Sequence, residues 1–133
     1  MKWEELSEDW CPVARTMSVI GDRWTLLIIR DCFLGLSRFD QFQKNLGITR
    51  HLLTDRLKRL VSVGILEKRP YQEKPMRYDY VLTEKGKDLG ASMSALMEWG
   101  KTHMPLRRSA KSGYSDETID ALSARVLARA NQS

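Results

Sequence analysis

The order of elements between residues 37 and 82 constrains this chain most, because two short amphipathic helices and a basic hairpin follow one another closely. The first helix is expected to begin at Ser37 and to end at Gly47, a residue type that suits a left-handed helix C-terminus. Thr49 is a good N-cap for the second helix. Four apolar residues then recur at helical spacing and predict its buried face: Leu53, Leu57, Leu60 and Val61.

The opposite face of this second helix is polar. Its exposed candidates are Thr49, Arg50, His51, Thr54, Asp55 and Lys58. Such a helix fits the major groove of DNA, where Arg and Lys pair with guanine and Thr contacts a thymine methyl group. For each residue, a contact with phosphate alone is the alternative, since half or more of protein–DNA hydrogen bonds go to the backbone.

Two alternating segments, Ile65 to Arg69 and Arg77 to Leu82, predict the strands of the hairpin, with Pro70 and Pro75 in the loop between them. Its basic residues are expected to contact the DNA backbone or minor groove: Lys68, Arg69, Lys74 and Arg77. Glu67 and Glu73 dilute this charge, so a solvated hairpin is the alternative. Two helices followed by such a hairpin predict a winged helix-turn-helix that recognises duplex DNA.

The charge distribution agrees with this interpretation. The chain carries a formal net charge of +5. Residues 38–87 hold twelve Lys and Arg against six Asp and Glu, whereas the rest of the chain holds ten against eleven. The net positive charge therefore belongs to the predicted DNA-reading segment, where phosphates would favour it.

The flanking segments supply the expected core. Asp22 caps a helix that is apolar nearly all round, which is typical of a central buried helix, and Thr83 begins a long last helix. The predicted fold class is mainly α with a small two-stranded antiparallel β-wing. We expect a loose arm at 1–10, one winged-helix domain at 11–104, and a linker with a short amphipathic helix at 105–133.

Cys11 stands at the expected N-cap of the first helix of that domain, before Pro12 at the first helical position. The positive end of the helix dipole and the nearby Arg15 favour a thiolate, so we expect the pKa of Cys11 to lie below the reference of about 8.5. Cys11 is therefore a candidate redox sensor, with an unreactive cap as the alternative. Cys32 lies within the apolar helix and is expected to pack in the core.

Several functional classes find no support in the sequence. No apolar run reaches the roughly 20 residues of a membrane span, and no apolar signal segment is recognisable, so we expect a cytoplasmic protein. His51, His103 and the two cysteines have no metal-ligand spacing. Nucleotide-binding and hydrolase motifs are absent, so neither a cofactor nor enzyme activity is expected, and a redox enzyme using Cys11 would lack a nearby resolving cysteine. The main alternative is a winged-helix protein–protein module that does not bind DNA.

Four motifs follow one another from Cys11 to His103: CPVARTMSVIGDRWTLLIIRDCFLG, RFDQFQKNLGIT, LTDRLKRLVSVGILEKR and YVLTEKGKDL. In content and order they resemble the HxlR-type transcription regulators, which are bacterial winged-helix proteins related in fold to the MarR type. The family often has Gly-Gly-Lys-Trp where this chain has Gly21-Asp22-Arg23-Trp24. Residues 105–133 lie outside the resemblance.

The resemblance implies a homodimer that binds a roughly palindromic operator and regulates nearby genes. We expect a repressor rather than an activator. It places the dimer interface on the first helix and the long last helix, at Val13, Met17, Met93, Leu96, Met97 and Met104. Packing of the last-helix stripe under the wing is the alternative. A methionine-rich seam could also hold a small apolar effector. Some regulators of this type sense oxidants or electrophiles through a cysteine at the position that Cys11 matches.

Overall fold

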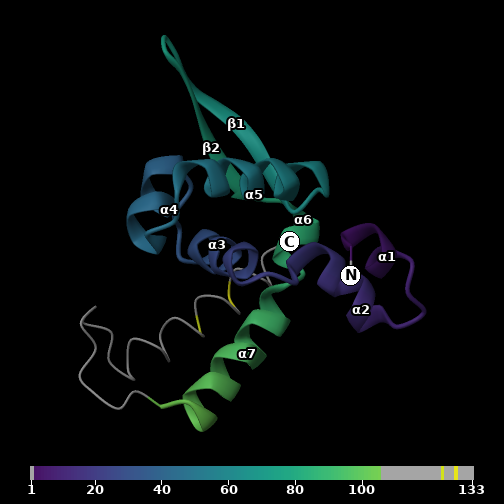
Figure 1. Ribbon diagram of the computed structural model, residues 1–133. Coiled ribbons are helices and arrows are strands. Elements are labelled where there is room, and N and C mark those ends of the chain that lie inside the picture. The colour runs from purple at the N-terminus through teal and green to yellow at the C-terminus, as the bar shows by residue number, and fades with distance from the viewer. Residues whose placement is uncertain (1, 106–123, 125–127, 129–133) are drawn as a thin grey trace.

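The structure is a computed structural model, in which residues 2–105, 124 and 128 are described. The elements are α1 (Trp3–Ser7), α2 (Pro12–Ile20), α3 (Arg23–Phe33), α4 (Phe39–Leu46), α5 (Arg50–Ser62), β1 (Leu66–Glu73), β2 (Met76–Leu82), α6 (Glu84–Lys87) and α7 (Gly90–His103). The predicted fold class is confirmed, because the helices are accompanied by a two-stranded antiparallel sheet. The hairpin and α7 leave the helical body in opposite directions (Figure 1).

Helix α3 forms the centre of the core, as its apolar composition predicts. Ile28, Ile29 and Phe33 are fully buried, and Cys32 is buried beside them. The helix begins at Asp22, whose Oδ1 accepts hydrogen bonds of 2.9 Å from the backbone N–H groups of Trp24 and Thr25. Helices α4 and α5 pack on this centre through Phe42, Leu53, Leu57 and Leu60.

The two helices of the helix-turn-helix are joined as expected. Gly47 ends α4 in the left-handed conformation, with φ of 65°. The hydroxyl of Thr49 then accepts a hydrogen bond of 3.3 Å from the backbone N–H of Leu52 and caps α5. The prediction that Ser37 caps α4 is wrong, because Arg38 is the N-cap. The backbone N–H groups of Ser37 and Arg38 donate instead to Gln41 Oε1. The Ser37 hydroxyl is thus left to donate a hydrogen bond to Asp79 in the wing.

The wing is longer than predicted, since β1 extends from Leu66 to Glu73. Pro70 lies within β1 opposite Tyr78, so its predicted place in the loop is wrong, whereas Pro75 does lie in the turn. A proline is tolerated there because β1 is an edge strand and needs no donor on its open side. The pairing register shifts between Pro70 and Gln72, which places an irregularity in the middle of the strand.

The expected single helix after Thr83 is divided in two. Helix α6 is capped by the Thr83 hydroxyl, which accepts from the N–H of Gly86 at 3.1 Å, and a turn then leads into α7. Gly86 explains the close packing at this point, because a Cβ atom there would overlap the carbonyl oxygen of Ile65. A side chain at position 86 would therefore force α6 away from the base of the wing.

Residues 1–10 are not simply a loose arm, because they contain helix α1, which packs on α2. The predicted linker and helix at 105–133 lie outside the described residues, apart from positions 105, 124 and 128. Among the helices that the structure describes, none has the length and apolar composition needed to span a membrane.

Candidate nucleic-acid interface

The candidate reading residues share one side of α5. All six are exposed: Thr49, Arg50, His51, Thr54, Asp55 and Lys58. The apolar side of the helix is buried in the core and contains Leu53, Leu57 and Leu60. The hydroxyl of Thr54 donates to the Arg50 carbonyl at 2.8 Å, so its methyl group is the part free for an external contact. The guanidinium of Arg50 leans over the Phe39 ring of α4 at 5.0 Å.

Arg56 is held away from this outer face. It forms ion pairs with Asp22 at 3.3 Å and with Asp55 at 2.6 Å. Burial acts to raise the pKa of Asp22, but hydrogen bonds from the Thr25 side chain and backbone, the charge of Arg56 and the Trp24 N–H together lower that pKa below its ordinary value. Asp22 therefore stays ionised, and Arg56 serves to fasten α5 to the start of α3.

Arg59 also turns inward. Its guanidinium lies over the Trp3 ring of α1 and donates to the Ser18 carbonyl of α2. The repeated Arg at positions 56 and 59 was visible in the sequence, but only the fold shows that these side chains bind neighbouring helices.

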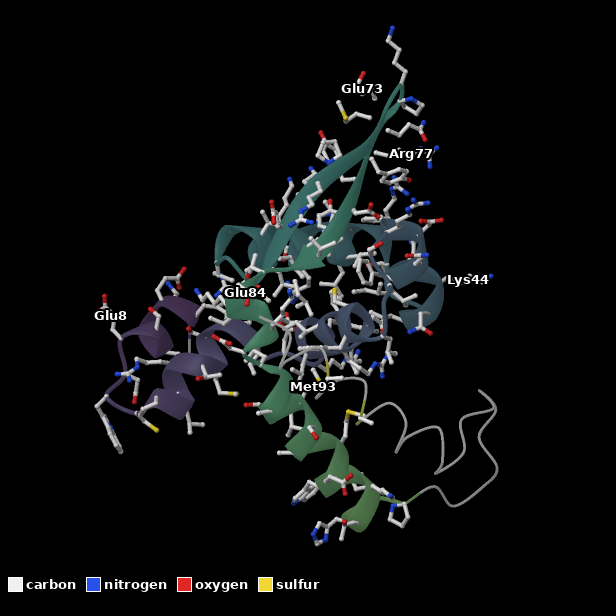
Figure 2. All side chains as sticks on the ribbon, turned by 180° about the vertical axis from the view of Figure 1, so that it is seen from behind. Glu8, Lys44, Glu73, Arg77, Glu84 and Met93 are labelled. Carbon is white, nitrogen blue, oxygen red and sulfur yellow. The ribbon has the colours of Figure 1, made fainter. Side chains whose placement is uncertain are left out.

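The basic residues of the wing are exposed, and two of them already have partners: Lys68 lies over the Tyr78 ring at 4.1 Å, and Arg69 pairs with Glu67 at 3.0 Å. Within the described part of the chain, Lys74 and Arg77 form no ion pair. Figure 2 shows Arg77 and Glu73 on the outer part of the hairpin, far from the helices. Lys74 and Arg77 are thus the wing cations most available to an external anion.

A polar junction between the wing and α4 was missed at the sequence level. Asp79 Oδ1 accepts hydrogen bonds from the Ser37 hydroxyl at 2.9 Å and from Arg38 Nε at 3.3 Å. The Arg38 guanidinium also lies over the Tyr71 ring, 3.9 Å from its centroid. The available signal was Asp79 between two tyrosines in β2, a strand whose other charged residue is Arg77.

Cys11 occupies the N-cap of α2 and is half-buried. Its thiol makes no capping hydrogen bond, and its backbone N–H donates to Asp9 Oδ1 at 2.9 Å. Arg15 Nη1 donates to the Asp9 carbonyl at 3.4 Å. Cys32 is buried, which confirms its place in the core.

The residues assigned to a dimer interface divide into two groups. Val13, Met17, Leu96 and Met104 are exposed, and Met97 is partly buried. Met93 is only 4% exposed and packs in the core of its own chain, so the prediction that it faces a partner is wrong. It lies where α7 meets the helical body (Figure 2). Two exposed tryptophans were missed: Trp10 at 87% and Trp99 at 59%.

A cavity of about 420 Å³ lies at the base of the wing, and none of the methionines of the predicted seam lines it. Its walls come from the end of α3, both strands and α6, and include Cys32, Ser37, Arg69, Tyr80 and Lys87. Burial, followed by the neighbouring Tyr78, raises the pKa of Tyr80, so its hydroxyl stays protonated. Among the described residues, no group of three His, Cys, Asp or Glu side chains could hold a metal ion.

Residues 19–108 match the HxlR-like helix-turn-helix family. The chain belongs to this family. It is 47% identical over 93 residues to Rv3095 of Mycobacterium tuberculosis, an uncharacterised HTH-type transcriptional regulator. The aligned region spans 70% of this chain and 59% of that relative, so the chain covers little more than half of the relative's length.

Two solved structures are also similar. The crystal structure of PA1607, described as a candidate transcription factor, has 39% identity and a TM-score of 0.73, covering 80% of this chain and 74% of that one. The redox regulator HypR in its oxidised form has 31% identity and a TM-score of 0.60, covering 72% of this chain and all of that one (100%).

Proposed function

We propose that this protein is a transcriptional regulator that binds duplex DNA sequence-specifically through α5, with the wing contacting the neighbouring backbone or minor groove. The observation that carries the proposal is the single polar face of α5, with all six candidate residues exposed over a buried apolar face. A wing with exposed basic residues extends beyond this helix, as phosphate contacts require (Figure 1). Similarity to HTH-type regulators supports the same function.

We further propose that the protein acts as a homodimer. Large apolar side chains are exposed both at the start of α2 and along α7, including Trp10, Val13, Leu96 and Trp99. Exposed apolar groups of this size are typical of surfaces that another protein covers. A second copy would bring two α5 helices onto a two-fold symmetric operator, with half-sites about 34 Å apart. Occupation of such an operator would block transcription, so the regulator would act as a repressor.

The decisive experiment selects binding sites from random duplex DNA with the purified protein and then measures affinity at several salt concentrations. We expect a roughly palindromic consensus and an affinity that falls steeply with salt, because phosphate neutralisation releases counterions. An asymmetric short site would contradict the dimer. Salt-independent affinity, or no selection of any sequence, would favour the protein–protein module instead.

A specific observation favours redox control of this DNA binding. Cys11 is half-buried beside the exposed apolar start of α2, and the chain resembles the redox regulator HypR. In the proposed dimer, a peroxide would oxidise two Cys11 thiols to a disulfide, while two electrons and two protons reduce the peroxide to two waters. The new bond would move α2 and thereby the relative placement of the two α5 helices. Cys11→Ser should remove this oxidant response while leaving DNA binding in reducing buffer unchanged.

A further inference from the structure

The inner part of the wing packs on the helices, since Tyr80 and Leu82 of β2 lie against the core, but the outer part projects beyond them (Figure 1). Only Leu66 at the start of β1 is buried, and the rest of that strand is exposed. A two-stranded hairpin is marginally stable by itself, so the outer hairpin needs support from elsewhere in the fold. Ser37 gives this support on the backbone, because its carbonyl accepts a hydrogen bond of 2.7 Å from the N–H of Tyr80.

Asp79 completes the support with its side chain. Its Oδ1 accepts hydrogen bonds from the Ser37 hydroxyl and from Arg38 Nε. One carboxylate therefore joins β2 to the two residues that precede α4. Arg38 then reaches the other strand by stacking on Tyr71, which lies at the irregularity in β1. Both strands of the wing are therefore fastened to the N-terminus of α4, the first helix of the helix-turn-helix.

We propose that Asp79 is a positioning residue for DNA recognition, which holds the wing at the angle that lets Lys74 and Arg77 reach the DNA while α5 occupies the groove. The proposal rests on the DNA-binding function proposed above. Asp79 touches no DNA in this role and acts through Ser37 and Arg38. By positioning the wing, Asp79 would raise the affinity for DNA. Its negative charge alone would lower that affinity, because a carboxylate near phosphates opposes binding.

The sign of the effect gives the test. Asp79→Ala should weaken binding to the selected operator about three- to tenfold, as expected for the loss of hydrogen bonds to a charged group. Glu73→Ala is the matched control, because Glu73 is an exposed acid in the same hairpin and forms no ion pair among the described residues. It should leave affinity unchanged or raise it. Equal or tighter binding by Asp79→Ala would overturn the proposal.

Salt dependence separates positioning from a general loss of folded protein. If the wing no longer reaches the backbone, fewer counterions are released and the slope of log K against log salt should become shallower by about one to two. A smaller folded fraction would lower the apparent affinity without changing that slope, and this outcome would count against positioning. In a Lys74→Ala/Arg77→Ala background, Asp79→Ala should have little further effect on affinity, whereas a full additive loss would contradict action through the wing.

A measurement without DNA tests the placement independently. In the free protein, Asp79→Ala should accelerate hydrogen exchange of the Tyr80 amide, which bonds Ser37, while amides in the centre of α5 stay protected. Unchanged Tyr80 exchange would reject the proposal even if the protein bound no DNA. Ser37→Ala removes one partner of Asp79 from outside the hairpin and should give the same changes to a smaller extent, so the test survives if Asp79→Ala does not fold.

Discussion

Arg59 of α5 lies over the indole ring of Trp3, with its Cζ 4.1 Å from the ring centroid. The same guanidinium donates to the Ser18 carbonyl near the end of α2, a helix with no basic residue in its own last turn. Arg59 therefore supplies the positive charge that a helix C-terminus favours. Through Arg59, α5 is therefore joined to both α1 and α2.

Removal of this stacking partner should destabilise the fold. Trp3→Ala is expected to lower the free energy of unfolding by about 1 kcal/mol, because a partly buried cation–π contact contributes about 0.5–2 kcal/mol. Urea unfolding followed by circular dichroism, at one fixed protein concentration, measures the change. Glu8→Ala, at the exposed end of α1, should stay within about 0.5 kcal/mol of the wild type. Equal stability of the two variants would show that docking of α1 contributes nothing.

Two glycines should respond oppositely to the same substitution. Gly86→Ala should destabilise the protein by about 1–3 kcal/mol, because the new methyl group overlaps the Ile65 carbonyl and the Leu82 side chain also lies close. Gly100→Ala meets nothing within 4 Å and lies inside α7, so it should stabilise by about 0.5–1 kcal/mol. Thermal unfolding of both variants checks this contrast. A stable Gly86→Ala protein would mean that α6 packs less tightly against the wing.

The depressed pKa of Asp22 predicts a pH-dependent contribution to stability. Because the pKa is lower in the folded protein than in the unfolded chain, ionised Asp22 stabilises the fold above the unfolded value of about 3.9. This contribution should disappear as the pH falls from there through the folded pKa. Unfolding of the wild type and of Asp22→Asn from pH 7 to pH 3 should show a difference at neutral pH that shrinks below about pH 4. A difference that stays constant over this range would exclude the carboxylate as its source.

The exposed polar face of α5 was predictable because its signal is local. Helical spacing places Leu53 and Asp55, two positions apart, on opposite sides of α5, and Thr49 and Gly47 mark the helix boundaries by their own chemistry. The buried α3 followed in the same way from its composition. Patterns of this kind need no knowledge of how helices pack on one another.

The contacts that orient those elements were not predictable. Ser37 and Asp79 are 42 positions apart in the sequence, and Arg59 and Trp3 come from opposite ends of the helical region that precedes the wing. Each contact therefore forms only when the helices and the wing have packed together. Helix α1 has five residues, too few for a helical period to show and too few to be stable without its neighbours. In the sequence, Met93 belongs to the same apolar stripe as Leu96 and Met97. Only the fold shows that the start of α7 packs in the core and buries Met93.

Substitutions of Arg50 and Lys74 should distinguish a side chain that contacts bases from one that contacts phosphates. Arg50→Ala should cost about 1–3 kcal/mol on the selected operator and relax the base preference at one position of each half-site. Lys74→Ala should weaken all sequences alike and make the salt slope shallower by about one. Competition between the operator and random DNA measures both effects. If Arg50→Ala weakened the two DNAs equally, Arg50 would be a phosphate contact.

Cys11 should be the more reactive of the two thiols. It is half-buried at a helix start, whereas Cys32 is only 5% exposed within the core around α3. Alkylation requires both access and the thiolate, so Cys11 should be labelled first and faster at higher pH, while Cys32 should react only as the protein unfolds. Brief treatment with iodoacetamide at several pH values, followed by peptide mass analysis, reads the two rates separately, and labelling in urea provides the reference for full access. Equal rates in the native protein would mean that the core around Cys32 opens readily. If Cys11 is labelled first but Cys11→Ser still loses DNA binding in peroxide, then Cys11 is accessible without being the sensor.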